Sequence, residues 1–426
     1  MLGLTNCIFG SSFYTVSVRL AVYADLIYWQ DSNGISTSTA FVSWLGGLSE
    51  YVDGLVVLGR THPVPGRADY ELAGAGIQFV PLPYYRSLHE ITSVAAATFR
   101  SAARWREEIG QCDAALVFGP HPYSAVFGLQ TRLAHVPLVV GVRQDFPKYL
   151  AQRTRDWRRL AAIPTGYGLE LVHRRLAKGG GVVAVGDEMS QRYSHRGTRV
   201  LTTGVSLVRP ADLVPLPEVL SRPWPGEHQA LVAGRLDPEK NPLLLIEIAK
   251  ELRRIGPWKL VVAGTGSLAS ELAAQVKSQS LDEVVTLVGR LDRDRLFQLY
   301  RQSTVLIHVS LTEGQPQVFY EAAAAGLPII ATAVGGVRIA LGDGKRGVLV
   351  QPDNAMAIAD AVSKLSAEQT LRKAMVEAAW KWSATETLDA QVARVATFID
   401  EIVSAGGRRS NRLGARRRLG HSSNRC

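Results

Sequence analysis

Two glutamates, Glu313 and Glu321, stand eight positions apart in a stretch that can build a ligand site. Pro316 suits the first turn of a helix, because proline lacks the N–H that this turn does not need. We therefore predict a loop carrying Glu313, a helix from about Pro316, and Glu321 within its first two turns. The free first-turn amides and the helix dipole favour an anion there. Two carboxylates beside an anion site indicate a ligand with phosphates at one end and hydroxyls at the other, such as a nucleotide-sugar.

Two basic residues flank a predicted turn in the segment 234–241, GRLDPEKN. Arg235 offers a forked contact and Lys240 a point charge, so the two side chains can converge on a diphosphate. Considered alone, the segment is more typical of a surface turn with a lysine–glutamate pair.

A glycine-rich turn at 264–267, GTGS, precedes a predicted helix. With Ala269 it matches the dinucleotide-binding pattern GxGxxA, in which phosphate lies on the helix end. The next strand ends in Gly289-Arg290, without the acidic residue that holds a ribose. We therefore predict a tight turn near a phosphate around Gly266, with NAD(P) binding as the alternative.

His121 lies between two prolines, directly after the apolar run 114–118. At the carboxyl end of a strand it can serve as an acceptor-side polar group or a proton shuttle, and the alternative is a solvated loop histidine. The segment 292–294, Asp-Arg-Asp, has the spacing of a metal-binding pair, but aspartates that open helices commonly cap free amides. We favour the cap and predict no required metal.

Composition indicates a globular protein of more than one domain. The chain has 426 residues, of which 46% are hydrophobic and 20% charged. Cys7, Cys112 and Cys426 are widely spaced and match no metal or redox motif, which is typical of a reducing compartment. No apolar run reaches the roughly 18 residues that span a bilayer, and residues 1–18 lack the basic start of a signal peptide. We therefore expect a cytoplasmic protein.

Apolar runs alternate with helical stretches along the chain, which predicts parallel sheets covered by helices on both faces. Five prolines between 207 and 227 mark a linker. The predicted parts are a poorly ordered lead-in (1–18), a Rossmann-like domain (19–206), a linker (207–228), a second Rossmann-like domain (229–384), a last helix (385–406) and a disordered basic tail (407–426).

Basic residues gather in several segments. Arg100, Arg104 and Arg106 surround Trp105 in a predicted helix, and four further arginines surround a tryptophan at 153–159. Such stretches suit either an anionic membrane surface or an ordinary solvated face. The tail holds seven arginines and no acidic residue, which accounts for seven of the ten net positive charges. It can hold an anionic lipid or nucleic acid electrostatically or stay solvated; we predict no nucleic-acid partner.

The motifs in their order resemble those of GT-B glycosyltransferases of the retaining family GT4, the glycosyl transferases group 1. GRLDPEKN, AGTG, VGRLDRDRL and EGQPQVFYEAAAAGLPIIATAVGG follow one another at the family's usual intervals, and the EX7E element with AxGLPIIAT is specific. The resemblance is strong over 229–381 and looser over 19–205. It implies an α/β GT-B fold: two doubly wound parallel-sheet domains face a central cleft, and the last helix crosses back to the first domain.

The resemblance also implies residue roles. Glu313 and His121 are the candidate catalytic residues near the transferred sugar, Lys240 and Arg235 hold the donor diphosphate, and Glu321 binds the ribose. The other implied donor contacts are Gly34, Gly266, Arg290, Leu291, Gly314, Gln315, Gln317 and Val318. Two positions depart from the family pattern. Gln315 replaces a large apolar residue, and only one glycine, Gly34, stands where a pair is usual.

The implied activity is transfer of a hexose, with retention and without a metal or other cofactor. The donor is a nucleotide-diphosphate sugar, and the acceptor is a glycan or a lipid-linked molecule. We expect the protein to be cytoplasmic and peripheral at the inner face of the plasma membrane. Two alternatives remain open: a nucleotide-sugar epimerase of the same fold, and a non-catalytic nucleotide-sugar-binding protein.

Overall fold

The computed structural model describes residues 15–87, 90–143, 145–147, 150, 158–224 and 228–406. The described chain forms two compact units. The first unit holds the residues up to Thr203 and those from Gln391 onward, and the second unit holds Gly204–Ala390. Most of the predicted lead-in, most of the basic stretch 153–159 and the whole tail 407–426 lie outside the described residues.

The first unit is built on a mainly parallel sheet. Its strands are β1 (Val16–Asp31), β2 (Gly34–Thr37), β3 (Val52–Thr61), β4 (Tyr70–Glu71), β5 (Ile77–Leu82), β6 (Ala114–Gly119), β7 (Leu138–Val142), β8 (Gly181–Val185) and β9 (Arg199–Thr203). The parallel pairings give the order β5-β3-β1-β6-β7-β8-β9. The short strand β2 pairs antiparallel with the carboxyl end of β1, and β4 pairs antiparallel with β2. The doubly wound sheet was predicted, and the two short antiparallel strands were not.

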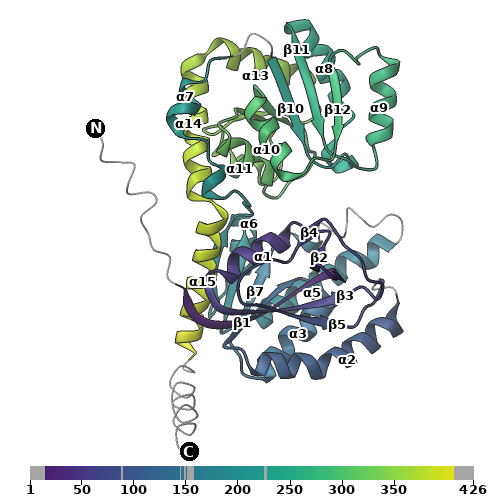
Figure 1. The fold of residues 1–426 in the computed structure, drawn as a ribbon, viewed down its shortest axis with the longest axis vertical. Helices are drawn as coiled ribbons and strands as arrows, with labels where there is room; N and C mark the ends of the chain where they lie inside the picture. Colours follow the sequence, from purple (N-terminus) through teal and green to yellow (C-terminus); the bar gives the residue numbers. More distant parts are fainter. Residues whose placement is uncertain are drawn as a thin grey trace, which may run out of the picture. The chain divides into compact units, whose positions relative to one another are not determined.

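Helices cover this sheet. They are α1 (Phe41–Ser49), α2 (Ile91–Gly110), α3 (Pro122–Leu133), α5 (Arg158–Leu176), α6 (Asp187–Tyr193) and most of α15 (Leu388–Ala405). Helices α2, α3 and α5 lie side by side along the sheet (Figure 1). The sequence pattern from about residue 36 to residue 50 indicates a helix, but α1 begins only at Phe41, because Gly34–Thr37 pairs with β1 as a strand.

Trp105 of α2 is fully buried and packs edge-on against the rings of Tyr23 and Phe127. Trp105 therefore belongs to the core and is available neither to a membrane surface nor to solvent. Arg100, Arg104 and Arg106 of the same helix remain exposed.

The second unit has a fully parallel sheet in the order β12-β11-β10-β13-β14-β15. These strands are β10 (His228–Ala233), β11 (Trp258–Ala263), β12 (Val285–Gly289), β13 (Val305–His308), β14 (Ile329–Thr332) and β15 (Val348–Val350). The central strands carry almost continuous β-branched and leucine residues, as expected for strands buried on both faces.

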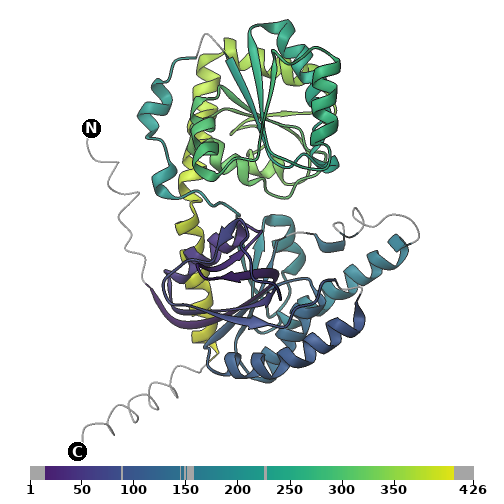
Figure 2. The same cartoon turned by 45° about the vertical axis from the view of Figure 1, so that its right-hand side comes forward.

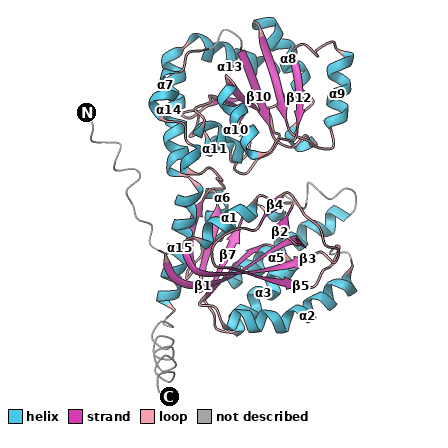
Figure 3. Ribbon diagram, in the orientation of Figure 1, coloured by secondary structure: helices cyan, strands magenta, loops and turns pink. Residues whose placement is uncertain are grey.

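Helices lie on both sides of this second sheet (Figure 2), and Figure 3 separates them from the strands by colour. They are α8 (Leu244–Ile255), α9 (Ala269–Ser278), α10 (Arg293–Gln302), α11 (Gln317–Ala324), α12 (Val337–Ala340), α13 (Ala355–Ala367) and α14 (Gln369–Thr385). Two apolar clusters result, one centred on Leu260 and Ile307 and one on Leu306 and Phe319.

The described part of the predicted linker, 207–228, is packed rather than free. It contains a 3-10 turn (Pro210–Asp212) and α7 (Leu216–Ser221). The amide of Val214 donates to the carbonyl of Ala324, and the indole of Trp380 donates to the carbonyl of Val214 at 2.8 Å. The segment therefore belongs to the second unit. No helix in the described part of the chain is both long and apolar enough to cross a membrane.

Candidate functional site

The strand order of the second unit reverses between β10 and β13, because β11 and β12 follow on one side and β14 and β15 on the other. Ligands of such sheets bind beyond the carboxyl ends of the strands at this reversal. The loops that follow β10 and β13 meet there, since the amide of Leu311 donates to the carbonyl of Glu239 at 2.9 Å. Lys240 and Glu313 lie on these two loops.

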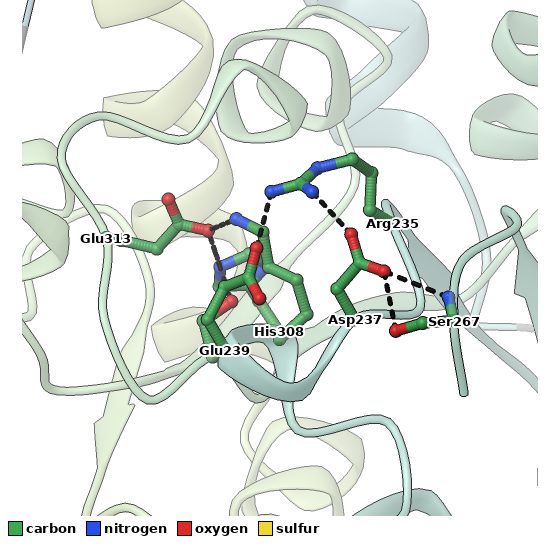
Figure 4. A network of polar contacts seen from close by, with 8 residues as sticks. Arg235, Asp237, Glu239, Ser267, His308 and Glu313 are labelled. Carbon is green, nitrogen blue, oxygen red and sulfur yellow. Dashed lines mark hydrogen bonds and ion pairs between the residues drawn. The ribbon is translucent and has the colours of Figure 1, made fainter. Parts of the chain in front are cut away.

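Glu313 is the centre of a polar network at this point (Figure 4). Its Oε1 forms an ion pair with Lys240 Nζ and lies 3.1 Å from both His308 Nε2 and Ser310 Oγ. The side chains of Glu313 and Lys240 are 11% and 23% exposed, so the pair is largely shielded from water. Sequence reasoning found the lysine and the glutamate but missed His308 and Ser310, which belong to the end of a strand and its following residues.

The surroundings of Glu313 fix its charge. Burial alone raises the pKa of this carboxyl, but the hydrogen bond from His308 and the positive charge of Lys240 outweigh burial and lower the pKa to about 2. Glu313 is therefore ionised at neutral pH. A carboxylate held in this way can accept hydrogen bonds from ligand hydroxyls and cannot act as a proton donor.

Arg235 joins this network from the start of the same loop. Its guanidinium donates to Asp237 and, at 2.6 Å, to Glu239 Oε1, and its side chain is 59% exposed. The Asp237 carboxylate also accepts the amide and hydroxyl of Ser267, at 2.9 and 3.0 Å (Figure 4). The loops after β10 and β11 are thus joined, and each predicted diphosphate-binding side chain is held by carboxylates.

Glycines allow these loops to pack backbone against backbone. A Cβ added to Gly266 would lie 2.4–2.6 Å from backbone atoms of Leu236, and one added to Gly336 would lie 1.8 Å from the carbonyl oxygen of Gly314. The amide of Gly336 donates to the carbonyl of Glu313 at 3.0 Å. The GTGS turn therefore closes against the loop after β10, and the glycine pair 335–336 fixes the backbone that carries Glu313.

Helix α11 begins at Gln317 with Pro316 as its N-cap, as predicted. Glu321 is in its second turn and is 9% exposed. Its carboxylate accepts hydrogen bonds from the Tyr300 hydroxyl at 2.8 Å and from Gln317 Nε2 at 3.0 Å, and burial raises its pKa. The two glutamates therefore belong to separate networks, and the side chain of Gln317 is turned toward Glu321.

Gln315 is half-buried between Glu313 and α11. Its Oε1 is buried and accepts no hydrogen bond from the described residues. An unpartnered amide oxygen can accept a hydrogen bond from a ligand hydroxyl. The other predicted donor contacts lie around the same edge: Gly314 is exposed, Val318 half-buried, Arg290 exposed after β12, and Leu291 packed against the nearby apolar cluster.

The predicted cap in the segment 292–294 is confirmed. The Asp292 side chain accepts from the amide of Arg295 at 2.9 Å and so caps α10. Across the described ranges, no three residues of the types His, Cys, Asp and Glu are grouped so as to hold a metal ion.

The first unit has a second polar cluster at its own strand-order reversal, between β1 and β6. His121 follows β6, as predicted, and its side chain also caps α3, which was not predicted. Its Nε2 lies 3.3 Å from Asp25 of β1, and Asp25 also accepts from Arg60 of β3 and from the hydroxyl of Tyr85. Gly34 is not part of this cluster, because it is the exposed first residue of β2, directly after the turn from β1.

The sequence did not predict three members of this cluster, because each lies within or beside an apolar strand pattern: Asp25, Arg60 and Tyr85. One signal was present: an aspartate inside an otherwise apolar run is unusual in a buried parallel strand.

Comparison with known proteins agrees with this geometry. Residues 222–382 match the family model described as glycosyl transferases group 1. The matched residues lie within the second unit, Gly204–Ala390. The resemblance seen in the sequence is thereby confirmed for the part of the chain that carries Lys240 and Glu313.

A sequence relative is the D-inositol 3-phosphate glycosyltransferase of Pseudarthrobacter chlorophenolicus, which is 31% identical over 194 residues. The aligned region covers 42% of this chain and 46% of the relative. The match thus spans less than half of the relative's length.

Solved structures extend the similarity to both units. Sucrose-phosphate synthase from Thermosynechococcus elongatus aligns with a TM-score of 0.66 and 19% identity, covering 91% of this chain and 99% of that protein. HepE from Anabaena, in complex with UDP and glucose, aligns with a TM-score of 0.62 and 16% identity, covering 91% and 100%. At these identities the likeness establishes the fold, which is GT-B.

Proposed function

We propose that this protein is a retaining, metal-independent hexosyltransferase, which moves a hexose from a nucleotide-diphosphate sugar to a glycan or lipid-linked acceptor. The observation that carries the proposal is the Lys240–Glu313 pair, with His308 and Ser310, at the strand-order reversal of a group 1 domain. A positive charge for a phosphate and an ionised carboxylate for hydroxyls stand side by side there.

The charge that develops on the departing nucleoside diphosphate needs fixed positive partners. Lys240, Arg235 and the first-turn amides of α11 supply them without a metal, as preorganised electrostatics. Arg235 has five N–H donors, so it can bind phosphate oxygens while keeping a contact to Asp237 or Glu239.

Glu313 positions the sugar and does not attack it. Lys240, His308 and Ser310 all contact its Oε1, and its pKa is lowered to about 2, so the carboxylate is weakly basic and a poor nucleophile. Retention then follows from attack of the acceptor on the face that the phosphate leaves, with the phosphate taking the acceptor proton. This differs from retaining glycosidases, in which a carboxylate forms a covalent glycosyl intermediate.

The free Oε1 of Gln315 supports contact with a sugar hydroxyl, because a hydroxyl can donate the hydrogen bond that this oxygen lacks. We propose Gln315 as a determinant of the transferred sugar. The complex of HepE with UDP and glucose supports a nucleotide-linked hexose as the donor.

We further propose a cytoplasmic location at the inner face of the plasma membrane. The exposed Arg100, Arg104 and Arg106 of α2 support an electrostatic contact with anionic lipid. Cosedimentation with anionic vesicles at low salt should fall when the three arginines are changed to glutamine. Equal binding by the variant would refute this contact.

The donor site is tested by thermal shift against UDP-, GDP- and ADP-sugars, followed by an assay of nucleoside diphosphate release. A ligand at a hundred times its Kd adds about 2.7 kcal/mol of stability, which is a readily measured rise in Tm. Lys240→Ala should abolish both the shift and the release. Lys250→Ala is the matched control, because Lys250 forms an exposed pair with Glu247 on α8.

The outcomes separate the candidate functions. A transferase releases nucleotide in proportion to glycosylated acceptor, and an epimerase yields an altered sugar without any acceptor. A non-catalytic binder gives the thermal shift with no product. If Lys240→Ala transferred sugar as well as wild type, the proposed donor site would be wrong.

A further inference from the structure

The Asp25 carboxylate is saturated by donors from its own unit. Oδ1 accepts the hydroxyls of Tyr85 at 2.6 Å and Tyr23 at 3.0 Å, and Oδ2 accepts Arg60 Nη2 at 3.2 Å and faces His121 Nε2 at 3.3 Å. An ionised carboxylate has about four acceptor sites, and all four are occupied. Asp25 therefore fixes its neighbours and does not offer an oxygen to a ligand.

An irregularity in β1 places Asp25 there. Between the pairs Tyr23–Leu58 and Ile27–Arg60, β1 advances by four residues while β3 advances by two. The extra residues form a bulge, and bulges re-aim side chains next to functional sites. The bulge also lies where the pairing of β1 with β6 ends, at Tyr23, so Asp25 reaches the loop that follows β6.

Both ring nitrogens of His121 are engaged. Nδ1 accepts the backbone N–H of Tyr123 at 3.3 Å, as the N-cap of α3. The neutral ring therefore carries its proton on Nε2, which is the nitrogen that faces Asp25. Burial lowers the pKa of His121, and the positive charge of Arg60 adds to this effect while the charge of Asp25 opposes it.

We propose that Asp25 is a positioning residue that holds His121 as a neutral Nε2–H donor, so that His121 serves a sugar hydroxyl as a fixed donor and not as a proton shuttle. The role of His121 toward sugar rests on the proposed function. The pair itself does not, because it is formed within the first unit.

The Nε2 proton of His121 can take a second acceptor besides Asp25. The contact between Nε2 and Asp25 is long for a hydrogen bond, and one N–H can be shared between two acceptors. A sugar hydroxyl approaching the ring edge can accept the same proton, while Asp25 keeps the ring in place. The lone pair of Nδ1, which a general base would need, already accepts the backbone N–H of Tyr123 at the start of α3.

The pair is tested directly by the ring ¹⁵N shifts of histidine in the full-length protein. His121 is one of nine histidines, and its signals are assigned as those lost in His121→Gln. The expected result at pH 7 is a neutral ring protonated on Nε2. A ring protonated on Nδ1, or one exchanging between both tautomers, would overturn the proposal whether or not the protein transfers sugar.

Two variants should move the pKa of His121 in opposite directions. Asp25→Asn removes the opposing negative charge and should lower it, and Arg60→Gln removes the positive charge and should raise it. The remaining titratable groups around the ring are unchanged in both variants: Tyr23, Tyr85, Tyr123 and His173. Arg60→Gln keeps both Asp25 and His121, so the test survives if Asp25→Asn does not fold. If the pKa of His121 moved in the same direction in both variants, or did not move in Arg60→Gln, the proposed pairing of His121 with Asp25 would be contradicted.

Kinetics separate the two functions of the His121 ring. An asparagine at position 121 would place an acceptor near the position of Nδ1 and so keep the helix cap. A glutamine at position 121 would place an N–H near the position of Nε2 and so keep the donor. His121→Gln should lose about 2–4 °C in Tm but keep several times more kcat/KM than His121→Ala, because the conservative change retains the donor. His121→Asn should keep its Tm and lose about tenfold in kcat/KM, close to His121→Ala.

These variants also exclude the alternative. A proton shuttle would leave His121→Gln as inactive as His121→Ala and would place the pKa of a histidine on the acid limb of the kcat/KM profile. A flat profile between pH 6 and 8 with active His121→Gln is the expected result. If wild type transferred no sugar at all, the proposed function would fail, while the ¹⁵N measurement would still decide the pair.

Discussion

Replacing Glu313 by glutamine tests the centre of the donor site. The change keeps the size of the side chain and removes the charge that balances Lys240. Because both side chains are mostly buried, the lysine is left with an uncompensated charge, which destabilises the fold. We expect a lower free energy of unfolding at pH 7 and loss of nucleotide release.

The size of the effect follows from the pKa of Glu313, which is lowered from 4.5 to about 2. At about 1.4 kcal/mol for each unit, the folded state gains on the order of 3 kcal/mol from the ionised form. Glutamine retains an oxygen for His308 and Ser310, so the expected loss is smaller, about 2 kcal/mol.

The pH dependence gives the sharper test. A carboxyl whose pKa is lowered by folding stabilises the protein above its unfolded pKa, and this contribution is lost as the pH falls through the folded value. The difference between wild type and Glu313→Gln should therefore be constant above about pH 5 and shrink between pH 4.5 and 2. Urea unfolding at several pH values measures it. A variant as stable as wild type at pH 7, or a difference that grows in acid, would refute the reasoning.

Three further changes probe the surroundings of Glu313. Gln315→Ala should leave the Tm within a degree or two, because the amide oxygen has no partner in the free protein, and should lower kcat/KM about tenfold; an unchanged kcat/KM would remove Gln315 from the sugar site. Gly336→Ala should lower the free energy of unfolding in urea by about 1–3 kcal/mol, because the new Cβ would lie 1.8 Å from the Gly314 carbonyl oxygen. A smaller loss would mean that the two loops separate easily. Glu321→Gln should be no less stable than wild type at pH 8, because burial raises the pKa of Glu321 and its ionisation opposes folding. A large loss of stability at pH 8 would contradict that direction.

The sequence predicted most of the fold, because local pattern governs the elements. The alternating apolar runs and helical stretches correspond to the parallel strands and helices of both units, and α11 begins beside Pro316 as the proline indicated. The errors fall where pairing with a distant strand overrides local pattern. Gly34–Thr37 looked like the approach to a helix and became a strand because the outer end of β1 offered it a partner.

The candidate site was predicted in part, for a similar reason. Lys240, Glu313 and His121 follow strands directly, so their place at a sheet edge could be inferred from order alone. The side chains that pair with these residues could not be inferred from the sequence. Asp25 reaches His121 only through a bulge in β1, and Glu321 turns to Tyr300 because α10 packs beside α11.

What the sequence by itself determined is the inventory of strands, turns and charged residues at strand ends. Hydrophobic periodicity and turn chemistry act over a few neighbouring residues, so they can be recognised directly in the sequence. Only the tertiary structure decided which charges meet. Lys240 and Glu313 are 73 positions apart, and Asp25 and His121 are brought together from β1 and the end of β6. Each pair forms because a parallel strand order reverses beside it, and that order arises from long-range pairing that local pattern does not encode.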